Sequence, residues 1–385
     1  MVDSLFCALL LLAADAPSAG VPASPAVRTE PREVKIVAGG DVTLGHHLPE
    51  FFEELKRRGP VDEQALLEYP FRGVSSLTQT ADVFWVNSEG TFTRSEDKTE
   101  KNFNFKADPV DARILQVAGV DVAQLANNHL YDYGPAGVIE TRKTLEQAGI
   151  GVYGAGQDLA EARKPVILER NGLKLGFLGY LYMGEHSIEP EALYATPEKP
   201  GIAGTHMDYE AIRSWILEDI SKLRPQVDFV FVGFHWGREG KNLIESYQRE
   251  LAHAAVEAGA DAVVGHHPHV LQGFEMIGEV PVYYSLGNFV FAGNWNPRRK
   301  DAGLLELIAR KDGEGKKSVK ARLIPISVDR QPGFPFQPYL YPPAEAARVE
   351  KLASCYLSAK EEGECEAKLG FPYPVKKEGR EPPRP

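Results

Sequence analysis

The sequence has fewer basic than acidic residues, which narrows the range of partners. It holds 43 Lys and Arg against 54 Asp and Glu, for a net charge of -11. Nucleic acids attract proteins through clustered Lys and Arg, so we expect no nucleic-acid partner. The apolar content is 43% over 385 residues, which is that of an ordinary globular protein with ample material for a large core.

Cysteine is scarce as well, with three residues in the whole chain. Cys7 lies in an N-terminal apolar run, whereas Cys355 and Cys365 are close in sequence. These two could close a small loop in an oxidising compartment. Such a disulfide would agree with export of the protein.

The N-terminal apolar run is too short to cross a bilayer as a permanent helix. It covers residues 5–14 and is followed by a stretch rich in Pro, Ala and Ser at residues 16–26. This pattern indicates an export signal over residues 1–20 and a linker over 21–32. We therefore expect an extracytoplasmic protein, in the periplasm or at the cell surface. Because Asp3 is the only early charge, a buried N-terminal segment is the alternative.

From residue 33 onward, β-branched apolar runs alternate with segments of helical periodicity. The predicted strands are Val34–Ala38, Val83–Val86, Asp121–Leu125, Leu173–Tyr182, Asp228–Phe234, Ala262–Val264 and Val282–Ser285. The predicted helices are Val61–Thr80, Pro109–Ala118, Pro135–Ala148, Tyr209–Leu223 and Leu243–Ala258. The alternation predicts one layered α/β domain over residues 33–330, with a loop-rich insertion around one strand over 170–213. Residues 331–373 form a C-terminal extension, and the charged, Pro-rich residues 374–385 are expected to be disordered.

Short polar clusters follow the ends of five predicted strands. They are Gly40-Asp41, Asn87-Ser88-Glu89, Asn127-Asn128-His129, His235-Trp236-Gly237 and Gly265-His266-His267-Pro268-His269. Ligands of α/β sheets bind beyond the carboxyl ends of the strands, so residues at those ends converge although they are far apart in sequence. We therefore expect the five clusters to form one site.

The chemistry of these clusters is carboxylate, imidazole and amide oxygen without thiolate. Such ligands suit a hard or borderline divalent cation, namely Mn, Fe, Zn or Mg. Taken singly, each cluster has an ordinary structural explanation, with Asp41 as a turn residue and His235 as a hydrogen-bonded loop histidine. The four histidines in two loops are harder to explain by packing, and residues 266–269 are the most specific signal.

In their order along the chain, these motifs resemble the signature of the CapA family of poly-gamma-glutamate capsule biosynthesis. The resemblance covers residues 33–292. That family is similar in turn to the calcineurin-like metallophosphoesterases, whose ligands follow the same order. The resemblance therefore implies an α/β fold built as a multi-layer β-sandwich flanked by helices.

The resemblance also implies a role for each motif residue. The implied metal ligands are Asp41, Glu89, Asn128, His235, His267 and His269, with Glu89 in the bridging position. His129 takes the position of the general acid that protonates the leaving oxygen. Further candidates, as outer-shell or substrate-binding residues, are His46, Lys106, Asn127, Glu239, His266 and Asn288.

The chain departs from the phosphoesterase pattern at two positions. Phosphoesterases carry Asp-x-His in the first motif, whereas the residue two after Asp41 is Thr43. One ligand is therefore missing, and His46 or His47 could substitute for it. Glu89 replaces an Asp and is longer by one methylene, so one or two bound ions both remain open.

Two kinds of function agree with these motifs. The first is a metal-dependent hydrolase that attacks a phosphoester or an amide with a metal-activated water, with His129 as general acid. The alternative is a non-catalytic polymer-binding or assembly subunit of the envelope capsule machinery. By resemblance, the partners are an anionic polymer such as poly-gamma-glutamate and capsule-synthesis membrane proteins.

Overall fold

The computed structural model describes residues 30–294, 297, 299–329 and 335–371. The predicted export signal and disordered tail lie outside the described residues. The first strand, β1, begins at Arg32, so the last residue of the predicted linker already belongs to the fold. Within the described residues, none of the helices combines the length and the apolar character that a membrane crossing requires.

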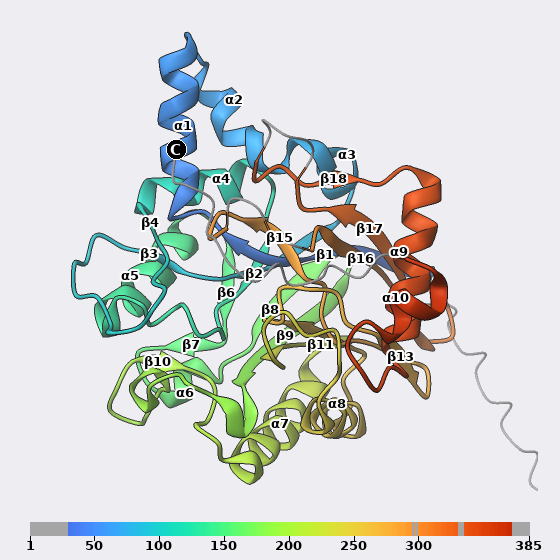
Figure 1. Cartoon of the computed structure of the whole chain (residues 1–385). Coiled ribbons are helices and arrows are strands. Elements are labelled where there is room, and N and C mark those ends of the chain that lie inside the picture. Colours follow the sequence, from blue (N-terminus) through green and yellow to red (C-terminus); the bar gives the residue numbers. More distant parts are fainter. Residues whose placement is uncertain (1–29, 295–296, 298, 330–334, 372–385) are drawn as a thin grey trace, which may run out of the picture.

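The larger sheet has eight strands in the order β18-β17-β16-β1-β2-β5-β6, with β15 beside β1 (Figure 1). Its strands are β1 (Arg32–Thr43), β2 (Val83–Ser88), β5 (Val122–Gln124), β6 (Gly151–Tyr153), β15 (Asn288–Phe291), β16 (Asp301–Lys311), β17 (Lys317–Ser327) and β18 (Tyr339–Leu340). Strands β2 and β15 run parallel to β1, and β5 and β6 continue the parallel part. The parallel strands therefore end at the same edge.

The second sheet has six strands in the order β13-β14-β12-β11-β9-β8. They are β8 (Val166–Arg170), β9 (Leu173–Tyr182), β11 (Phe229–Trp236), β12 (Ala262–His266), β13 (Phe274–Ile277) and β14 (Val280–Tyr283). The four central strands are parallel, and the edge strands β8 and β13 are antiparallel to their neighbours. Two short pairs join β3 (Thr91–Phe92) with β4 (Lys106–Ala107) and β7 (Ala155–Gly156) with β10 (Gly201–Ile202).

The two sheets pack face to face through an apolar core. Trp85 of the larger sheet lies against Phe177 of the smaller one, with ring centroids 5.5 Å apart, and Phe177 stacks on Phe231. All three side chains are buried. Each contributes roughly 1.5–3 kcal/mol by leaving water.

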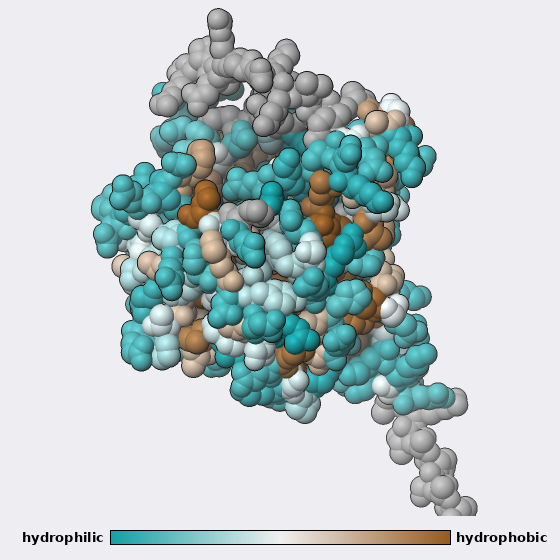
Figure 2. Space-filling view, turned by 60° about the horizontal axis from the view of Figure 1, so that its bottom comes forward, coloured by the Kyte–Doolittle hydropathy of each residue, from teal (hydrophilic) through white to brown (hydrophobic). Residues whose placement is uncertain are grey.

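Helices cover the outer faces of both sheets (Figure 1). The smaller sheet is covered by α7 (Tyr209–Leu223) and α8 (Ser246–Ala258), whose apolar faces share one core with β9, β11 and β12. The larger sheet is covered by α1 (His47–Arg58), α4 (Ala112–Val117) and α5 (Gly134–Gln147). The predicted α/β sandwich flanked by helices is therefore confirmed. On the face that Figure 2 shows, hydrophilic residues predominate and apolar ones lie in small scattered groups.

The C-terminal extension packs on the sandwich. Val349, Leu352 and Ala353 of α9 (Pro343–Tyr356) belong to the core between the sheets. A short helix α10 (Glu364–Leu369) follows, and Cys355 forms a disulfide with Cys365. This segment is therefore held to the sandwich both by apolar burial and by a local crosslink.

Several local predictions were wrong. The single helix predicted over residues 61–80 is α2 (Glu63–Glu68), a 3-10 helix (Tyr69–Val74) and α3 (Ser75–Thr78). Pro70 lacks an N–H and interrupts the helical hydrogen bonds. The loop-rich insertion predicted around one strand over 170–213 does hold that strand, β9, and two 3-10 turns (Gly184–His186 and Glu191–Leu193), but it also contains β10, which was not predicted. Elements that were not predicted from the sequence include α1, α6 (Leu159–Ala162), the β16–β17 hairpin and α9.

Candidate metal centre

The polar clusters come together where the parallel strands of both sheets end. Asp41, near the end of β1, pairs in register with Asn87 of β2 and with Asn288 of β15. In the other sheet, His235 of β11 pairs with His266 of β12. The sandwich therefore brings the predicted ligands from both sheets to one place.

Asp41, Glu89 and His269 form the first of two groups of residues that can donate ligand atoms to a metal ion, called donor groups below. Nδ1 of His269 lies 3.2 Å from Oδ2 of Asp41, and its Nε2 lies 3.5 Å from Oε1 of Glu89. Both carboxylates are fully buried, whereas the His269 side chain is 18% exposed. The group is therefore closed on the carboxylate side and reaches solvent at His269.

Asn128, His235 and His267 form a second group beside the first. Nε2 of His235 lies 2.9 Å from Oδ1 of Asn128 and 3.1 Å from Nδ1 of His267. Oε1 of Glu89 is 4.0 Å from the same His235 nitrogen. Glu89 thus stands between the two groups, in the position that the resemblance implies for a bridging carboxylate.

A divalent cation fits these residues. Both carboxylate oxygens of Glu89 are buried, and neither has a hydrogen-bond partner in the structure. Buried polar groups are almost always satisfied, so an orphaned carboxylate calls for a partner such as a metal ion. Burial raises the pKa of Glu89 well above its usual range, and a bound cation would oppose that shift by stabilising the charge. The donor set of oxygens and imidazoles suits Mn, Fe, Zn or Mg.

The histidines of the two groups differ in charge. Burial lowers the pKa of His267 to about 3, and it lowers that of His235 well below the usual range. Burial also opposes the charge of His269, but Glu89 and Asp41 outweigh it and raise the pKa of His269 to about 10. In the metal-free protein, His235 and His267 are therefore neutral and ready to bind a cation, whereas His269 carries a proton.

The turn that carries His267 and His269 has unusual backbone geometry. The φ angles are 95° at His267 and 57° at His269, in a region that residues other than glycine rarely adopt. A backbone conformation of this kind costs on the order of 1–3 kcal/mol of folding free energy per residue, and it persists only where the surrounding structure holds it in place. The strained conformation on both sides of Pro268 is consistent with a turn that directs the imidazoles of His267 and His269 toward the same site.

His129 lies beside the donor groups and is held by Asp132. Nδ1 of His129 donates to Oδ2 of Asp132 at 2.8 Å, and Nε2 lies 3.9 Å from Oε1 of Glu89. The backbone N–H of Phe105 donates to the same Asp132 oxygen at 2.6 Å. Burial lowers the pKa of His129, and Asp132 opposes that shift. Sequence reasoning missed Asp132, although its spacing of three residues from His129 was a usable signal.

A buried network of ion pairs, which includes Lys101 and Glu189, holds Asn128 and Asp132 in place. Nζ of Lys101 lies 2.8 Å from Oδ1 of Asp132 and 3.1 Å from Oε2 of Glu189, and it donates to the carbonyl oxygen of Asn128 at 3.0 Å. Nδ2 of Asn128 donates to Oε1 of Glu189 at 3.0 Å. This bond fixes the amide so that its oxygen faces His235. Lys101 and Glu189 lie in loops away from the strand ends, so no local pattern pointed to them.

Two of the further candidates support the donor groups. Nδ2 of Asn127 donates to the carbonyl oxygen of Ser88 at 2.8 Å, and its Oδ1 accepts from the N–H of His129. Asn127 therefore holds the loop that carries Asn128 and His129. Oδ1 of Asn288 accepts from Nδ1 of His269 at 2.9 Å, so it orients that ring.

Two other candidates contact different partners. Nζ of Lys106 pairs with Oε1 of Glu96 at 2.7 Å and lies over the ring of Tyr133. His46 is exposed, and its ring lies 3.9 Å from the His47 ring and 5.9 Å from the Phe105 ring. The structure thus does not bring Lys106 or His46 into either donor group.

His266 and Glu239 flank the donor groups. His266 is buried with Nδ1 3.6 Å from Oδ1 of Asp41, and neither of its ring nitrogens has a hydrogen-bond partner in the structure. Burial lowers its pKa to about 4. Glu239 is exposed, yet a carboxylate oxygen and one nitrogen each of His267 and His269 lie within 4.8 Å of one another.

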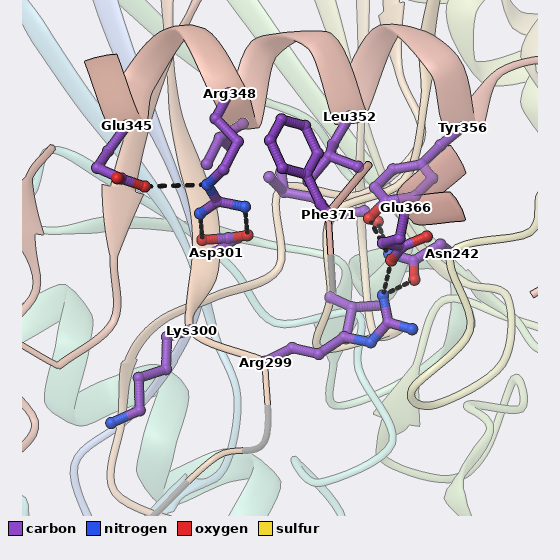
Figure 3. Close-up of a pocket in the computed structure, with 13 residues that line it drawn as sticks. Asn242, Arg299, Lys300, Asp301, Glu345, Arg348, Leu352, Tyr356, Glu366 and Phe371 are labelled. Atoms are coloured by element: carbon purple, nitrogen blue, oxygen red, sulfur yellow. Dashed lines mark hydrogen bonds and ion pairs between the residues drawn. The ribbon is translucent and has the colours of Figure 1, made fainter. Parts of the chain in front are cut away.

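A cavity of about 460 Å³ beside α9 is separate from this chemistry. Most of its charged side chains are paired with one another, as Figure 3 shows, whereas Lys300 pairs with Asp329 outside the cavity. Arg348 contacts both oxygens of Asp301, at 2.7 and 2.9 Å, and Arg299 lies 3.2 Å from Glu366. None of the predicted ligands lines this cavity.

The sequence of this chain is similar to the sequences of known capsule synthesis proteins. The family model for the bacterial capsule synthesis protein PGA_cap matches residues 35–293. The capsule biosynthesis protein CapA of Bacillus anthracis is 32% identical over 314 residues, which cover 80% of this chain and 71% of that protein. The PGA biosynthesis protein CapA of Bacillus subtilis (strain 168) is 28% identical over 302 residues, which cover 77% of this chain and 74% of that protein.

Similarity to solved structures is weaker. A hypothetical protein from Thermus thermophilus has a TM-score of 0.41 and 16% sequence identity, and the match covers 75% of this chain and 99% of that chain. The fold assignment therefore depends on the sheet topology described above. The segment that the family model matches extends from β1 past β15 and contains both donor groups and His129.

Proposed function

This chain belongs to the PGA_cap family of bacterial capsule synthesis proteins, which confirms the family predicted from its motifs, and on that premise we propose that it is a metal-dependent hydrolase of capsule biosynthesis. The substrate is a phosphoester or an amide connected with an anionic polymer such as poly-gamma-glutamate. The observation that carries the proposal is the 3.9 Å separation between Nε2 of His129 and Oε1 of Glu89. A residue able to donate a proton thus lies next to a set of residues that can bind a cation.

The two donor groups would hold the cation from both sheets. Asp41, Glu89 and His269 supply two carboxylates and one imidazole, and Asn128, His235 and His267 supply an amide oxygen and two imidazoles. When bound, a divalent cation supplies Lewis-acid polarisation of a substrate oxygen and a more acidic water. Glu89 and Asp41 are fully buried, so their charges act in a medium of low dielectric constant.

His129 is arranged to pass a proton to a leaving group. Asp132 accepts a hydrogen bond from Nδ1–H of His129, which leaves Nε2 facing Glu89. In the free protein, burial lowers the pKa of His129, which favours the neutral ring. An anionic substrate beside the ring would raise that pKa and favour the protonated form, which can donate. Asp132 stabilises the imidazolium that results.

We also propose that the protein acts outside the cytoplasm with capsule-synthesis membrane proteins as partners. The disulfide between Cys355 and Cys365 supports this location, because disulfides persist mainly in oxidising compartments. The names of the similar proteins, which concern capsule and PGA biosynthesis, support the partners.

Metal content and turnover test the proposed activity together. The purified protein is analysed for bound metals and assayed on phosphomonoesters, phosphodiesters and poly-gamma-glutamate chains, alongside His129→Ala and His267→Ala. We expect bound metal in the parent and in His129→Ala, less metal in His267→Ala, and loss of turnover in both variants. Circular dichroism confirms that each variant is folded.

Other outcomes separate the alternatives. Turnover on poly-gamma-glutamate alone would identify an amide hydrolase, and turnover on esters alone a phosphoesterase. Stoichiometric metal without turnover on any substrate, combined with polymer binding that His129→Ala leaves unchanged, would establish a non-catalytic polymer-binding subunit instead.

A further inference from the structure

The cation position at Asp41 has few protein ligands. Besides Asp41 it has Glu89 and His269. Thr43 stands where a metallophosphoesterase-like motif would carry a histidine, and its hydroxyl is buried and donates to the carbonyl oxygen of Glu89. His46, the nearest alternative in sequence, is exposed and packs against His47. The solvent side of this position is therefore open to another donor.

Glu239 lies on that solvent side. One of its carboxylate oxygens and one ring nitrogen each of His267 and His269 lie within 4.8 Å of one another, which is close enough for a single ion to contact all three. Glu239 follows β11 in a turn that also contains Gly237 and Gly240, both with positive φ. The chain thus folds back over the end of the strand and brings an exposed carboxylate to buried imidazoles.

The turn that carries Glu239 is fixed against the histidine turn. The N–H of Gly240 donates to the carbonyl oxygen of Pro268 at 2.8 Å. A Cβ at Gly237 would lie 3.1 Å from Cγ of Pro268, so the two turns are in close contact. Neighbouring Arg238 is engaged elsewhere, with Nε 3.1 Å from Oε1 of Glu245.

Glu239 adds a further carboxylate to the donor groups. One ion can contact Glu239 together with His267 and His269, and His269 also belongs to the first donor group. A cation placed between these residues would be attracted by three carboxylates, those of Asp41, Glu89 and Glu239.

We propose that Glu239 is a cation ligand on the solvent side of the site, where it binds the ion together with His267 and His269. This inference depends on the metal site of the proposed function, but not on the hydrolysis reaction. Because Asp41 and Glu89 are fully buried and Glu239 is exposed, Glu239 is the carboxylate ligand that can exchange with an anionic group of a substrate.

Metal titration of Glu239→Gln tests the proposal without any substrate. Isothermal titration calorimetry with Mn²⁺ and with Zn²⁺ compares the parent, Glu239→Gln, Glu239→Asp and the control Glu257→Gln, an exposed glutamate on α8. Even outer-shell partners of metal ligands are worth about 10- to 100-fold in affinity, so we expect Glu239→Gln to weaken binding by at least about tenfold. Glu239→Asp should bind with intermediate affinity and Glu257→Gln like the parent.

Electron paramagnetic resonance of bound Mn²⁺ supplies a second readout, because loss of a carboxylate ligand changes the spectrum of Glu239→Gln. Equal affinity and an unchanged spectrum in Glu239→Gln would overturn the proposal, as would a parent that binds no cation. Turnover of the parent separates this result from the proposed function. A parent that hydrolyses substrate while Glu239→Gln binds metal normally refutes only the role of Glu239, whereas weaker metal binding without turnover in the parent refutes only the hydrolase.

Discussion

Nδ1 of His129 donates a hydrogen bond to Oδ2 of Asp132 at 2.8 Å, three residues further along the chain. Both side chains are buried, and the opposite ring nitrogen faces Glu89. The pair therefore sets which ring nitrogen of His129 faces the donor groups. In the proposed reaction, Asp132 would act by positioning His129 and by stabilising the charged ring.

Asp132→Asn is expected to lower kcat more than it changes KM. General acid catalysis contributes typically 10²- to 10⁴-fold, so we expect a loss of about 100-fold or more. An amide stabilises the imidazolium less than a carboxylate does, so the pKa of His129 falls, and the alkaline limb of the rate profile, where the general acid loses its proton, moves to lower pH. Steady-state kinetics across pH measure both effects. A loss of activity with an unshifted pH profile would mean that Asp132 is only structural.

Lys101→Met is expected to destabilise the fold. It leaves the carboxylates of Asp132 and Glu189 buried without their shared cation. Removing one partner of a buried ion pair typically costs about 3–5 kcal/mol. Urea unfolding measures the difference, with Lys98→Met, an exposed lysine of the same loop, as control. Equal stability of the two variants would contradict the network described here.

Glu189→Gln tests the orientation of Asn128. The two oxygens of Glu189 accept separately from Lys101 and from Nδ2 of Asn128, whereas a glutamine has one oxygen and turns its amide nitrogen, which cannot accept, toward one of these two donors. We therefore expect the Asn128 side chain to lose its fixed orientation and the affinity for Mn²⁺ to fall by about tenfold, as for other outer-shell partners. Calorimetric titration measures the change. Unchanged affinity would show that Asn128 holds its orientation without Glu189.

Metal affinity is expected to rise with pH. The pKa of His269 is raised to about 10 in the metal-free protein, so the ring carries a proton at neutral pH and must lose it to bind a cation. The affinity should therefore increase by up to about tenfold per pH unit below pH 10 and fall on acidification. Titrations in buffers of different ionisation enthalpy count the protons released. Release of no proton between about pH 6.5 and 8.5 would contradict the charge state of His269.

Reduction of the disulfide is expected to destabilise the protein moderately. Cys355 and Cys365 are 10 residues apart, and crosslinks of loops this short contribute about 2–3 kcal/mol. α9 keeps its apolar contacts with the core after reduction, so the sandwich should remain folded. Thermal unfolding of the parent with and without reductant, and of Cys355→Ala/Cys365→Ala, measures the effect. An identical melting temperature in all three samples would contradict it.

The elements of the fold that could be predicted from the sequence are those with a clear hydrophobic pattern. The buried parallel strands stand out as β-branched runs, and the polar residues after them mark the strand ends. Sheet order then places Asp41, Asn128 and His267 together, because parallel strands end at one edge. Strands β16 and β17 were missed because their outward positions carry charged residues, such as Lys320 and Arg322, that dilute the apolar pattern.

Contacts between loops were not predictable in the same way. Lys101 and Glu189 are 88 residues apart, and each belongs to a segment without periodicity. Glu239 was predicted only as an outer-shell or substrate-binding residue, because its approach to His267 and His269 depends on the two turns that Gly240 and Pro268 join. Pairings of this kind depend on tertiary geometry that no local pattern encodes.

Asp41, Glu89, His235 and their neighbours are proposed to hold a divalent cation. Anomalous diffraction from crystals of the protein grown with Mn²⁺ or Zn²⁺, recorded on both sides of the metal absorption edge, tests this proposal directly. We predict an anomalous peak in contact with the Glu89 carboxylate, with His269 or His235 among its ligands. A saturated crystal with no peak at Glu89, or with peaks only at other places on the molecule, would contradict the account.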